Sequence, residues 1–259
     1  MTLRSLLAAL AVLASLAVSA PSGLLAQANG PGPVSLVLSY KASLQDRAAF
    51  RKTVETVVAP RFKAWKDAHI MASVQLLFTA AADTSGSDLT VILDFDRFSD
   101  LGGWLDIERT LPGGLPPEAL RYVTAITSQV ADGVAQGSGP QAKPESGVFM
   151  VIPYTVTVDA GKYRRYVKEY TTPQMDAWVR SGVMASYRIF MNENPAEAPW
   201  GALLVLEYKG LDGLAQRETL KAKVRAQLAS NPAWKAWSDD KTGVRTELHP
   251  LIAVPIVAP

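Results

Sequence analysis

Hydrophobic residues follow two different periods along the chain, and each change of period marks a new element. Val34 to Ala42 is rich in apolar and β-branched residues, which predicts a strand. The apolar positions that follow recur every three or four residues, as in a helix that Asp46 could cap. Further strands are predicted over Ile70 to Thr79 and Leu89 to Phe95, with turn residues between them. The helical face consists of Phe50, Val54, Val57, Val58, Phe62 and Trp65.

The same pattern occurs a second time, 113 residues further along the chain. The motif P-x3-A-W-x5-M-A-S runs from Pro60 to Ser73 and again from Pro173 to Ser186. Upstream of the motif the offset becomes 114, and it pairs Tyr40 with Tyr154. Two copies at a nearly constant spacing, with the same order of elements, indicate a duplicated structural unit.

The second copy continues the pattern to a closing strand. After strands over Val183 to Met191 and Ala202 to Tyr208, a helix is predicted over Gly213 to Ala229 and a last strand over Val244 to Val254. The order of elements is therefore βαββαβ. In the first copy, Glu118 to Val134 is compatible with a helix, a strand, or one followed by the other. Pro60 and its twin should kink the first helix of each copy.

The copies define the domain boundaries. We expect a first α+β repeat over residues 34–135, a linker rich in Gly, Pro, Gln and Ser over 136–147, and a second repeat over 148–257. Residues 1–28 have the pattern of a secretory signal peptide: Arg4, an apolar run, and the A-x-A site that ends at Ala28. A membrane anchor is the alternative, but the run is shorter than a spanning helix needs. The mature chain is expected to be periplasmic or secreted, with no membrane span.

Composition narrows the classes of partner. The formal net charge is only +2 and no basic run is present, so a nucleic-acid partner is not expected. Cysteine is absent, which removes disulfides, thiol nucleophiles and thiolate metal sites. The sequence also lacks the G-x-S-x-G, P-loop, G-x-G-x-x-G and H-E-x-x-H motifs. No metal and no cofactor are predicted, and either a monomer or a homodimer is compatible with the sequence.

The element order, the Trp-bearing first helix and the duplication together resemble the dimeric α+β barrel superfamily in its fused, two-repeat form. This resemblance implies an α+β fold of two tandem ferredoxin-like βαββαβ repeats, with their antiparallel sheets packed face to face. It covers about residues 34 to 257. The superfamily includes small monooxygenases, isomerases and haem-handling proteins, so the fold alone does not determine the function.

Two histidines are the first candidates for chemistry. His69 ends the first helix, where a histidine is often only a favourable charge. His249 lies in the last strand before Pro250. Some fused barrels of the superfamily bind haem through a histidine in the second half, so the resemblance makes His249 a haem-ligand alternative.

Paired carboxylates and tyrosines are the other candidates. Asp94 and Glu207 hold equivalent positions near the ends of the third strands, where they could act as acid and base or merely face solvent. Tyr40 and Tyr154 should share the strand face that looks into the space between the sheets, where they could contact a ligand or serve as core. Trp65 and Trp178 are expected to be core anchors. Four tryptophans have no twin and are better pocket candidates: Trp104, Trp200, Trp234 and Trp237.

Three functions are compatible with these residues. The first is an exported protein that binds a small apolar or aromatic molecule in the barrel. The second is a monooxygenase- or isomerase-type enzyme that is cofactor-free or uses haem, with Asp94, Glu207 or His249 as catalytic candidates. The third is a structural or association module. The sequence does not decide whether the protein is an enzyme.

Overall fold

The computed structural model of the protein describes residues 33–83, 85–140, 147–196 and 198–257. The predicted signal peptide lies outside the described residues. Among the described residues, no helix has both the length and the hydropathy to cross a membrane.

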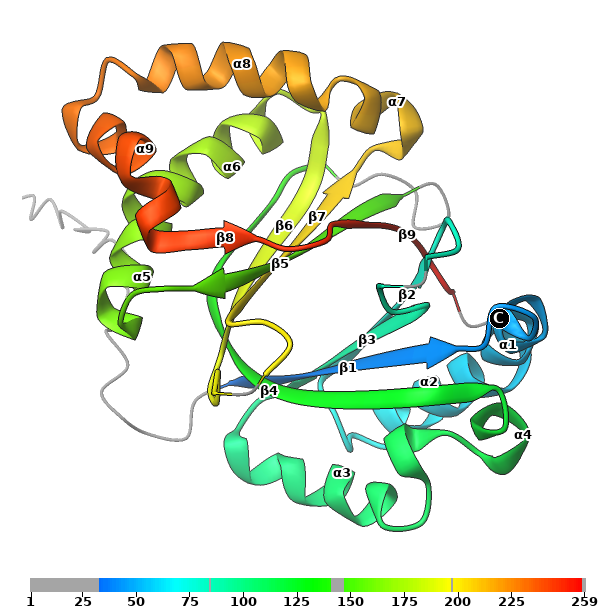
Figure 1. Cartoon of the computed structure of the whole chain (residues 1–259). Helices are drawn as coiled ribbons and strands as arrows, with labels where there is room; N and C mark the ends of the chain where they lie inside the picture. Colours follow the sequence, from blue (N-terminus) through cyan, green and yellow to red (C-terminus); the bar gives the residue numbers. More distant parts are fainter. Residues whose placement is uncertain (1–32, 84, 141–146, 197, 258–259) are drawn as a thin grey trace, which may run out of the picture. The chain divides into compact units, whose positions relative to one another are not determined.

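Both repeats have the predicted order of elements (Figure 1). The first repeat comprises β1 (Val34–Ala42), α1 (Arg47–Thr53), a π-helical turn (Val54–Val58), α2 (Ala59–Asp67), β2 (Ser73–Thr79), β3 (Leu89–Phe95), α3 (Leu101–Glu108), α4 (Pro117–Leu120) and β4 (Val123–Ser138). The second comprises β5 (Val148–Val156), α5 (Ala160–Tyr166), a π-helical turn (Val167–Thr171), α6 (Thr172–Arg180), β6 (Met184–Asn192), β7 (Ala202–Tyr208), α7 (Gly210–Ala215), α8 (Arg217–Leu228), α9 (Pro232–Val244), β8 (Arg245–Glu247) and β9 (Leu251–Pro255).

The strands close into one antiparallel barrel. Their order is β7-β6-β4-β1-β3-β2-β9-β5-β8, and an additional pairing of β7 with β5 completes the circle. The last strand of each repeat makes this closure possible, because it pairs with its own repeat and then with the other. β4 pairs with β1 up to Ala131 and with β6 from Ala131 to Ser138, while β9 pairs with both β5 and β2. The two sheets of the fused α+β barrel are therefore joined at their edges.

The described residues form three hydrophobic cores. One lies between the first repeat's sheet and its helices, the second lies at the equivalent place in the second repeat, and the third fills part of the barrel interior. Alternation along β1 shows the division: Leu36, Leu38 and Tyr40 face the helices, whereas Val37 faces the interior. Figure 1 shows the helices outside the ring of strands.

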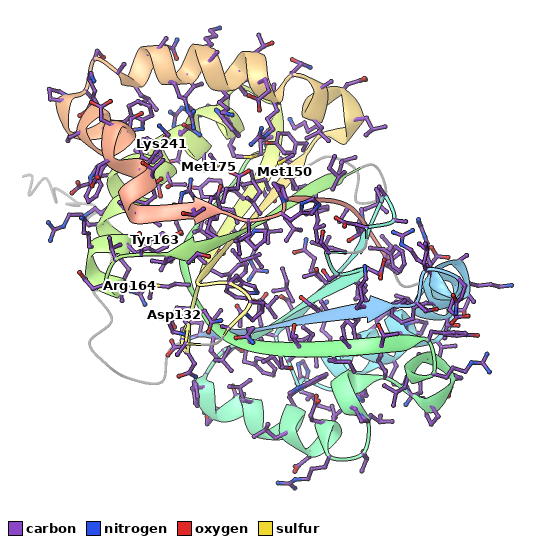
Figure 2. The ribbon with its side chains drawn as sticks, viewed as in Figure 1. Asp132, Met150, Tyr163, Arg164, Met175 and Lys241 are labelled. Carbon is purple, nitrogen blue, oxygen red and sulfur yellow. The ribbon has the colours of Figure 1, made fainter. Side chains whose placement is uncertain are left out.

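Ion pairs also connect the repeats. Arg164 on α5 donates to Asp132 on β4, and Figure 2 shows the two side chains meeting at the edge of the barrel. Arg188 on β6 donates to Asp94 on β3 at 2.5 Å. The second pair is only about a quarter exposed, so solvent screens it less than the first.

The shared prolines Pro60 and Pro173 interrupt the first helix of each repeat, as predicted. Each lies two residues after the end of a π-helical turn, at the second position of the helix that follows. A widened turn accommodates a residue without an N–H, so the helix is interrupted without ending. The cap at Asp46 differs from expectation: its side chain accepts from Ser43 Oγ and caps no helix N–H. Its twin Asp159 does cap, accepting from Lys162 N at 2.9 Å.

Two regions clarify or correct the predicted elements. Residues 117–138 form the short helix α4 followed by the long strand β4, one of the three alternatives that the sequence left open. β4 extends to Ser138, three residues into the segment expected as a linker, of which residues 141–146 lie outside the described chain. Asn231-Pro232 ends one helix, as predicted, but it also begins α9. The Asn231 side chain accepts from Ala233 N and Trp234 N, and proline suits the first helical position.

The duplicated tryptophans provide a test of the packing. Trp178 is 2 % exposed in the second helical core, whereas its twin Trp65 is only partly buried at the edge of the first. We expect Trp178→Ala to lower the free energy of unfolding by about 3–5 kcal/mol, and Trp65→Ala to lower it by less. Urea titrations of both variants measure this difference. An equal or larger loss for Trp65→Ala would contradict the assignment of Trp178 as the stronger anchor.

Candidate functional site

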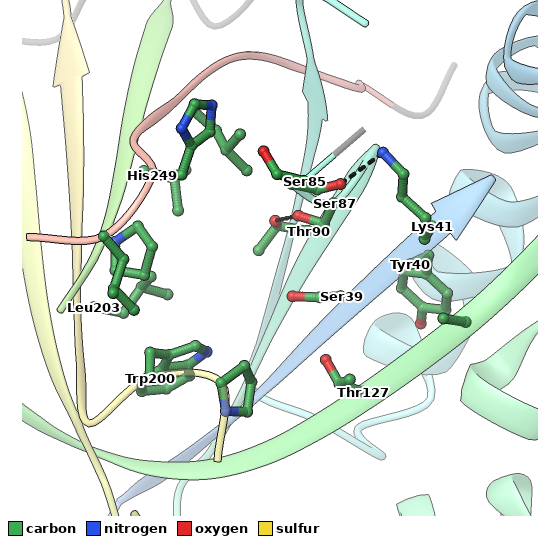
Figure 3. Close-up of a pocket in the computed structure, with 17 residues that line it drawn as sticks. Ser39, Tyr40, Lys41, Ser85, Ser87, Thr90, Thr127, Trp200, Leu203 and His249 are labelled. Carbon is green, nitrogen blue, oxygen red and sulfur yellow. Dashed lines mark hydrogen bonds between the residues drawn. The ribbon is translucent and has the colours of Figure 1, made fainter. Parts of the chain in front are cut away.

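A cavity of about 360 Å³ lies in the barrel at the end where β1 finishes and β3 begins (Figure 3). Inward-facing residues of both repeats line it, including Ser39 on β1 and Leu203 on β7. Ala125 and Thr127 on β4 also line it and are exposed, so the cavity opens to solvent beside this strand. The interior core closes off the rest of the barrel.

The two sides of the cavity differ in polarity. On one side, the register sets Ser39 beside Thr90 of β3 and Thr127 of β4, so that three hydroxyl side chains form a row across three strands. On the other side lie the apolar residues Leu203 and Trp200, both nearly buried. Figure 3 shows Trp200 across the cavity from Ser39 and Thr127. Such a cavity can accommodate an apolar body with one polar edge.

Charged side chains surround the mouth, and they are engaged with one another. Asp88, 2 % exposed, accepts from Arg47 Nε at 2.8 Å and lies 3.4 Å from Lys41 Nζ. Lys41 Nζ also donates to the carbonyl oxygens of Asp83 and Gly86, the latter at 2.7 Å. These contacts fix the β2–β3 loop over the end of β1. The charged side chains at the mouth thus hold the β2–β3 loop in place.

Asp83 and His249 form a contact between the repeats at this mouth. His249 Nε2 lies 2.5 Å from Asp83 Oδ2. Hydrogen bonds from the backbone N–H and hydroxyl of Ser85, and then the nearby His249, lower the pKa of Asp83 to about 2. Gly86 permits the loop to approach β9, because a Cβ atom there would lie 2.5 Å from Leu251 Cδ2.

Tyr40 and Tyr154 lie on the opposite strand face from the one predicted. Both side chains belong to the helix-facing cores, although Tyr40 borders the cavity. The Tyr40 hydroxyl donates to the Gly113 carbonyl at 2.5 Å, and the Tyr154 hydroxyl donates to Glu247 at 3.1 Å. Burial raises the pKa of each phenol. The interior face of β1 is its more polar face, with Ser35 and Ser39, and β5 is apolar on both faces, so alternation alone could not show which face was interior.

Asp94 and Glu207 do face the barrel interior, but at the end away from the cavity. Asp94 accepts from Ser35 Oγ at 2.7 Å and from Ser73 and Arg188, while Glu207 accepts from Ser186 Oγ at 2.6 Å. Ser35 and Ser39 are four residues apart on β1, so Asp94 lies about 13 Å from the hydroxyl row. Burial alone would raise the pKa of Asp94, but the hydrogen bonds and charge of Arg188, with the serine hydroxyls, hold it below its usual value.

The histidines do not fit a haem ligand. His249 is 61 % exposed at the mouth, and its Nε2 atom already contacts Asp83. His69 borders a cavity of only about 60 Å³, enough for about two waters. In the second repeat, the space between sheet and helices is packed with aromatic side chains such as Tyr163, Tyr166 and Trp178. Neither histidine therefore lies in a space that could hold haem. Within the described residues, no group of three or more acidic or histidine side chains could hold a metal ion.

Sequence reasoning missed most of the residues that surround the cavity. The three residues of the hydroxyl row, Ser39, Thr90 and Thr127, belong to no sequence motif, because only strand register brings them together. Trp200 had a weak signal as a tryptophan without a twin, and it does line the cavity. The same signal misleads for Trp104 and Trp234, which are buried against helices. Arg188, the partner of Asp94, had no signal beyond its charge.

The fold is that of the dimeric α+β barrel proteins, in the fused form. No family model matches the sequence, and no curated protein matches it. Among solved structures, a proposed monooxygenase from Lactobacillus acidophilus is similar, with a TM-score of 0.55 and 14% identity over 87% of this chain and 95% of that one. A proposed monooxygenase from Fusobacterium nucleatum has a TM-score of 0.51 and 9% identity over 87% and 93%. A cyanide-bound variant of chlorite dismutase from Candidatus Nitrospira defluvii has a TM-score of 0.50 and 12% identity over 87% and 91%.

The link between Asp94 and Arg188 predicts a pH-dependent stability. Because the pKa of Asp94 is lowered by folding, its contribution is present above about pH 4, the unfolded pKa, and is lost as the pH falls through the folded pKa. We expect Asp94→Asn to lower the free energy of unfolding by about 1–3 kcal/mol at pH 7, with the difference from wild type shrinking in acid.

Glu207→Gln is the matched control, since Glu207 receives one serine hydrogen bond and no arginine in the described structure. Its cost at pH 7 should be smaller. Denaturant titrations from pH 3 to pH 7 measure both effects. A constant cost for Asp94→Asn across that range would refute the ionic contribution.

Proposed function

We propose that the protein binds a small apolar or aromatic molecule in the cavity of the barrel. The observation that carries this proposal is the cavity itself, since the described core packs the remaining interior with buried side chains. A volume of about 360 Å³ falls within the range of about 300–1,000 Å³ that is typical of small-molecule sites. The apolar residues Val151, Leu203 and Leu251 and the indole of Trp200 favour an apolar or aromatic body.

A monooxygenase- or isomerase-type enzyme is the second candidate. The similarity of the fold to two proposed monooxygenases favours it. Of the catalytic candidates Asp94, Glu207 and His249, only His249 borders the cavity, and it would have to leave Asp83 to act as a base. Incubation with a bound ligand would distinguish this enzyme from a binding protein. A monooxygenase would consume oxygen and convert the ligand, an isomerase would convert the ligand without oxygen, and a binding protein would leave it unchanged. A structural or association module, as monomer or homodimer, remains the third proposal.

Export is part of the proposal, with cleavage of the signal peptide after Ala28. Because the A-x-A site defines the cleaved bond, we expect the protein recovered from the periplasm or medium to begin at Asn29. N-terminal sequencing of that fraction measures this. Recovery of an uncleaved chain in the membrane fraction would instead support an anchor.

Filling the cavity tests the binding site. Ala125 lines the cavity and is exposed, so a tryptophan there adds bulk without removing a packed side chain. We expect Ala125→Trp to weaken the binding of 2-naphthol at least about tenfold, as calorimetry would measure it.

Ser128→Trp is the control on the same strand. Ser128 is exposed, and it is paired with Leu38, whose side chain faces the helices, so the new indole would lie outside the barrel. This variant should bind 2-naphthol like the wild type. Unchanged binding by Ala125→Trp would show that the ligand lies elsewhere.

A further inference from the structure

The hydroxyl row has an arrangement that the packing of the barrel does not require. Ser39 stands between Thr90 and Thr127 on adjacent strands, about 4.8 Å apart from strand to strand. Thr90 Oγ1 has a partner in Ser87 Oγ at 3.2 Å. Within the described part of the chain, the structure gives neither Ser39 Oγ nor Thr127 Oγ1 a hydrogen bond. Both hydroxyls are thus able to bind a molecule in the cavity.

The duplication provides an internal comparison for this row. The repeat offsets match Ser39 with Pro153 and Thr90 with Leu203, and these two partners are themselves paired across β5 and β7. Both pairs line the same cavity from opposite sides. One copy of the unit therefore fills these positions with apolar residues, and the other fills them with hydroxyls. Since the fold accepts apolar side chains at these positions, the hydroxyls indicate a requirement of the ligand.

The charges near the cavity restrict the ligand further. Apart from the phenol of Tyr40, which donates to Gly113, Lys41 and His249 are the described lining residues with an ionisable side chain, and both are engaged: Lys41 with Asp88 and two carbonyls, His249 with Asp83. The row itself consists of neutral groups that can each donate and accept. A charged ligand would lose its hydration without gaining a counter-ion inside the cavity, which is unfavourable.

We propose that the ligand is an uncharged aromatic molecule with a hydroxyl or carbonyl group, such as a phenol or an aryl ketone. Its polar edge binds the row of Thr90, Ser39 and Thr127, and its ring lies against Trp200 and Leu203. This inference rests on the proposed function, because it specifies the chemistry and orientation of the molecule in the same cavity. It assigns the first repeat to polar recognition and the second repeat to apolar contact.

Three probes of similar size and different polarity test the chemical class. Calorimetric titrations would compare 2-naphthol, naphthalene and 2-naphthoate on the full mature chain. We expect 2-naphthol to bind about tenfold more tightly than naphthalene, because it adds hydrogen bonds to the row, and 2-naphthoate to bind most weakly. Equal affinities of 2-naphthol and naphthalene, or tightest binding of 2-naphthoate, would overturn the assignment of a neutral polar edge.

The double variant Ser39→Ala/Thr127→Val tests the row itself. It should weaken 2-naphthol about tenfold and leave naphthalene unchanged, since only the hydroxyls are removed. The control is Ser128→Ala, which removes a hydroxyl from an exposed position of β4 that is paired with Leu38 and therefore lies outside the barrel. The control should bind both probes like the wild type.

The outcomes separate this inference from the proposed function. If no probe binds the wild type, the proposed function fails. If naphthalene and 2-naphthol both bind, both lose affinity with Ala125→Trp, and both respond equally to the double variant, then the cavity is a binding site but the orientation by the row is wrong. Selective loss of 2-naphthol in the double variant alone supports the inference.

Discussion

Closure of the sheet by the exchanged last strands is the constraint on which the rest of this structure depends. A ferredoxin-like unit covers one face of its sheet with helices and leaves the other face and the edges uncovered. β4 resolves this for the first repeat by pairing first with β1 and then with β6, and β9 pairs in the same way with β5 and β2. The uncovered faces become the barrel interior, and the edges disappear into the ring. The cavity exists because this interior is only partly filled.

The two repeats differ both in the barrel interior and in the helix-facing cores. On the helix-facing side, Tyr40 and Tyr154 remain tyrosines in equivalent cores. On the interior side, Thr90 corresponds to Leu203, and Gln75 corresponds to Arg188. Other pairs in the helix-facing cores differ, such as Phe62 with Met175 and Leu89 with Ala202. In the interior, Thr90 and Leu203 belong to the polar and the apolar side of the cavity, and Arg188 forms an ion pair with Asp94.

The polar groups of the barrel are separated along its length. Asp94, Arg188 and Glu207 occupy one end, and the hydroxyl row and the mouth occupy the other. The apolar interior core around Val37 and Ile92 lies between them. Coulombic coupling across that length is weak beside the direct contacts each group makes. The ion pair between Asp94 and Arg188 therefore acts as a link between repeats, while neutral hydroxyls line the cavity at the other end.

The sequence by itself determined the duplication, the order of elements in each repeat and the fused α+β barrel, because these follow from local periodicity and from similarity at a fixed offset. The strands over Leu89–Phe95 and Ala202–Tyr208 were predicted with their observed bounds. The sequence also predicted that Trp178 anchors a core, since a large apolar side chain on the apolar face of a helix is normally buried against the sheet. The helix α9 was missed, because Asn231-Pro232 signals both the end of one helix and the start of the next.

Only the tertiary structure decided which strand face is interior and which residues meet in the cavity. The interior face of β1 carries Ser35 and Ser39, and β5 is apolar on both faces, so alternation placed Tyr40 and Tyr154 on the wrong face. The hydroxyl row depends on the register among β3, β1 and β4, and register is a long-range property of pairing that the order of residues along one strand does not contain.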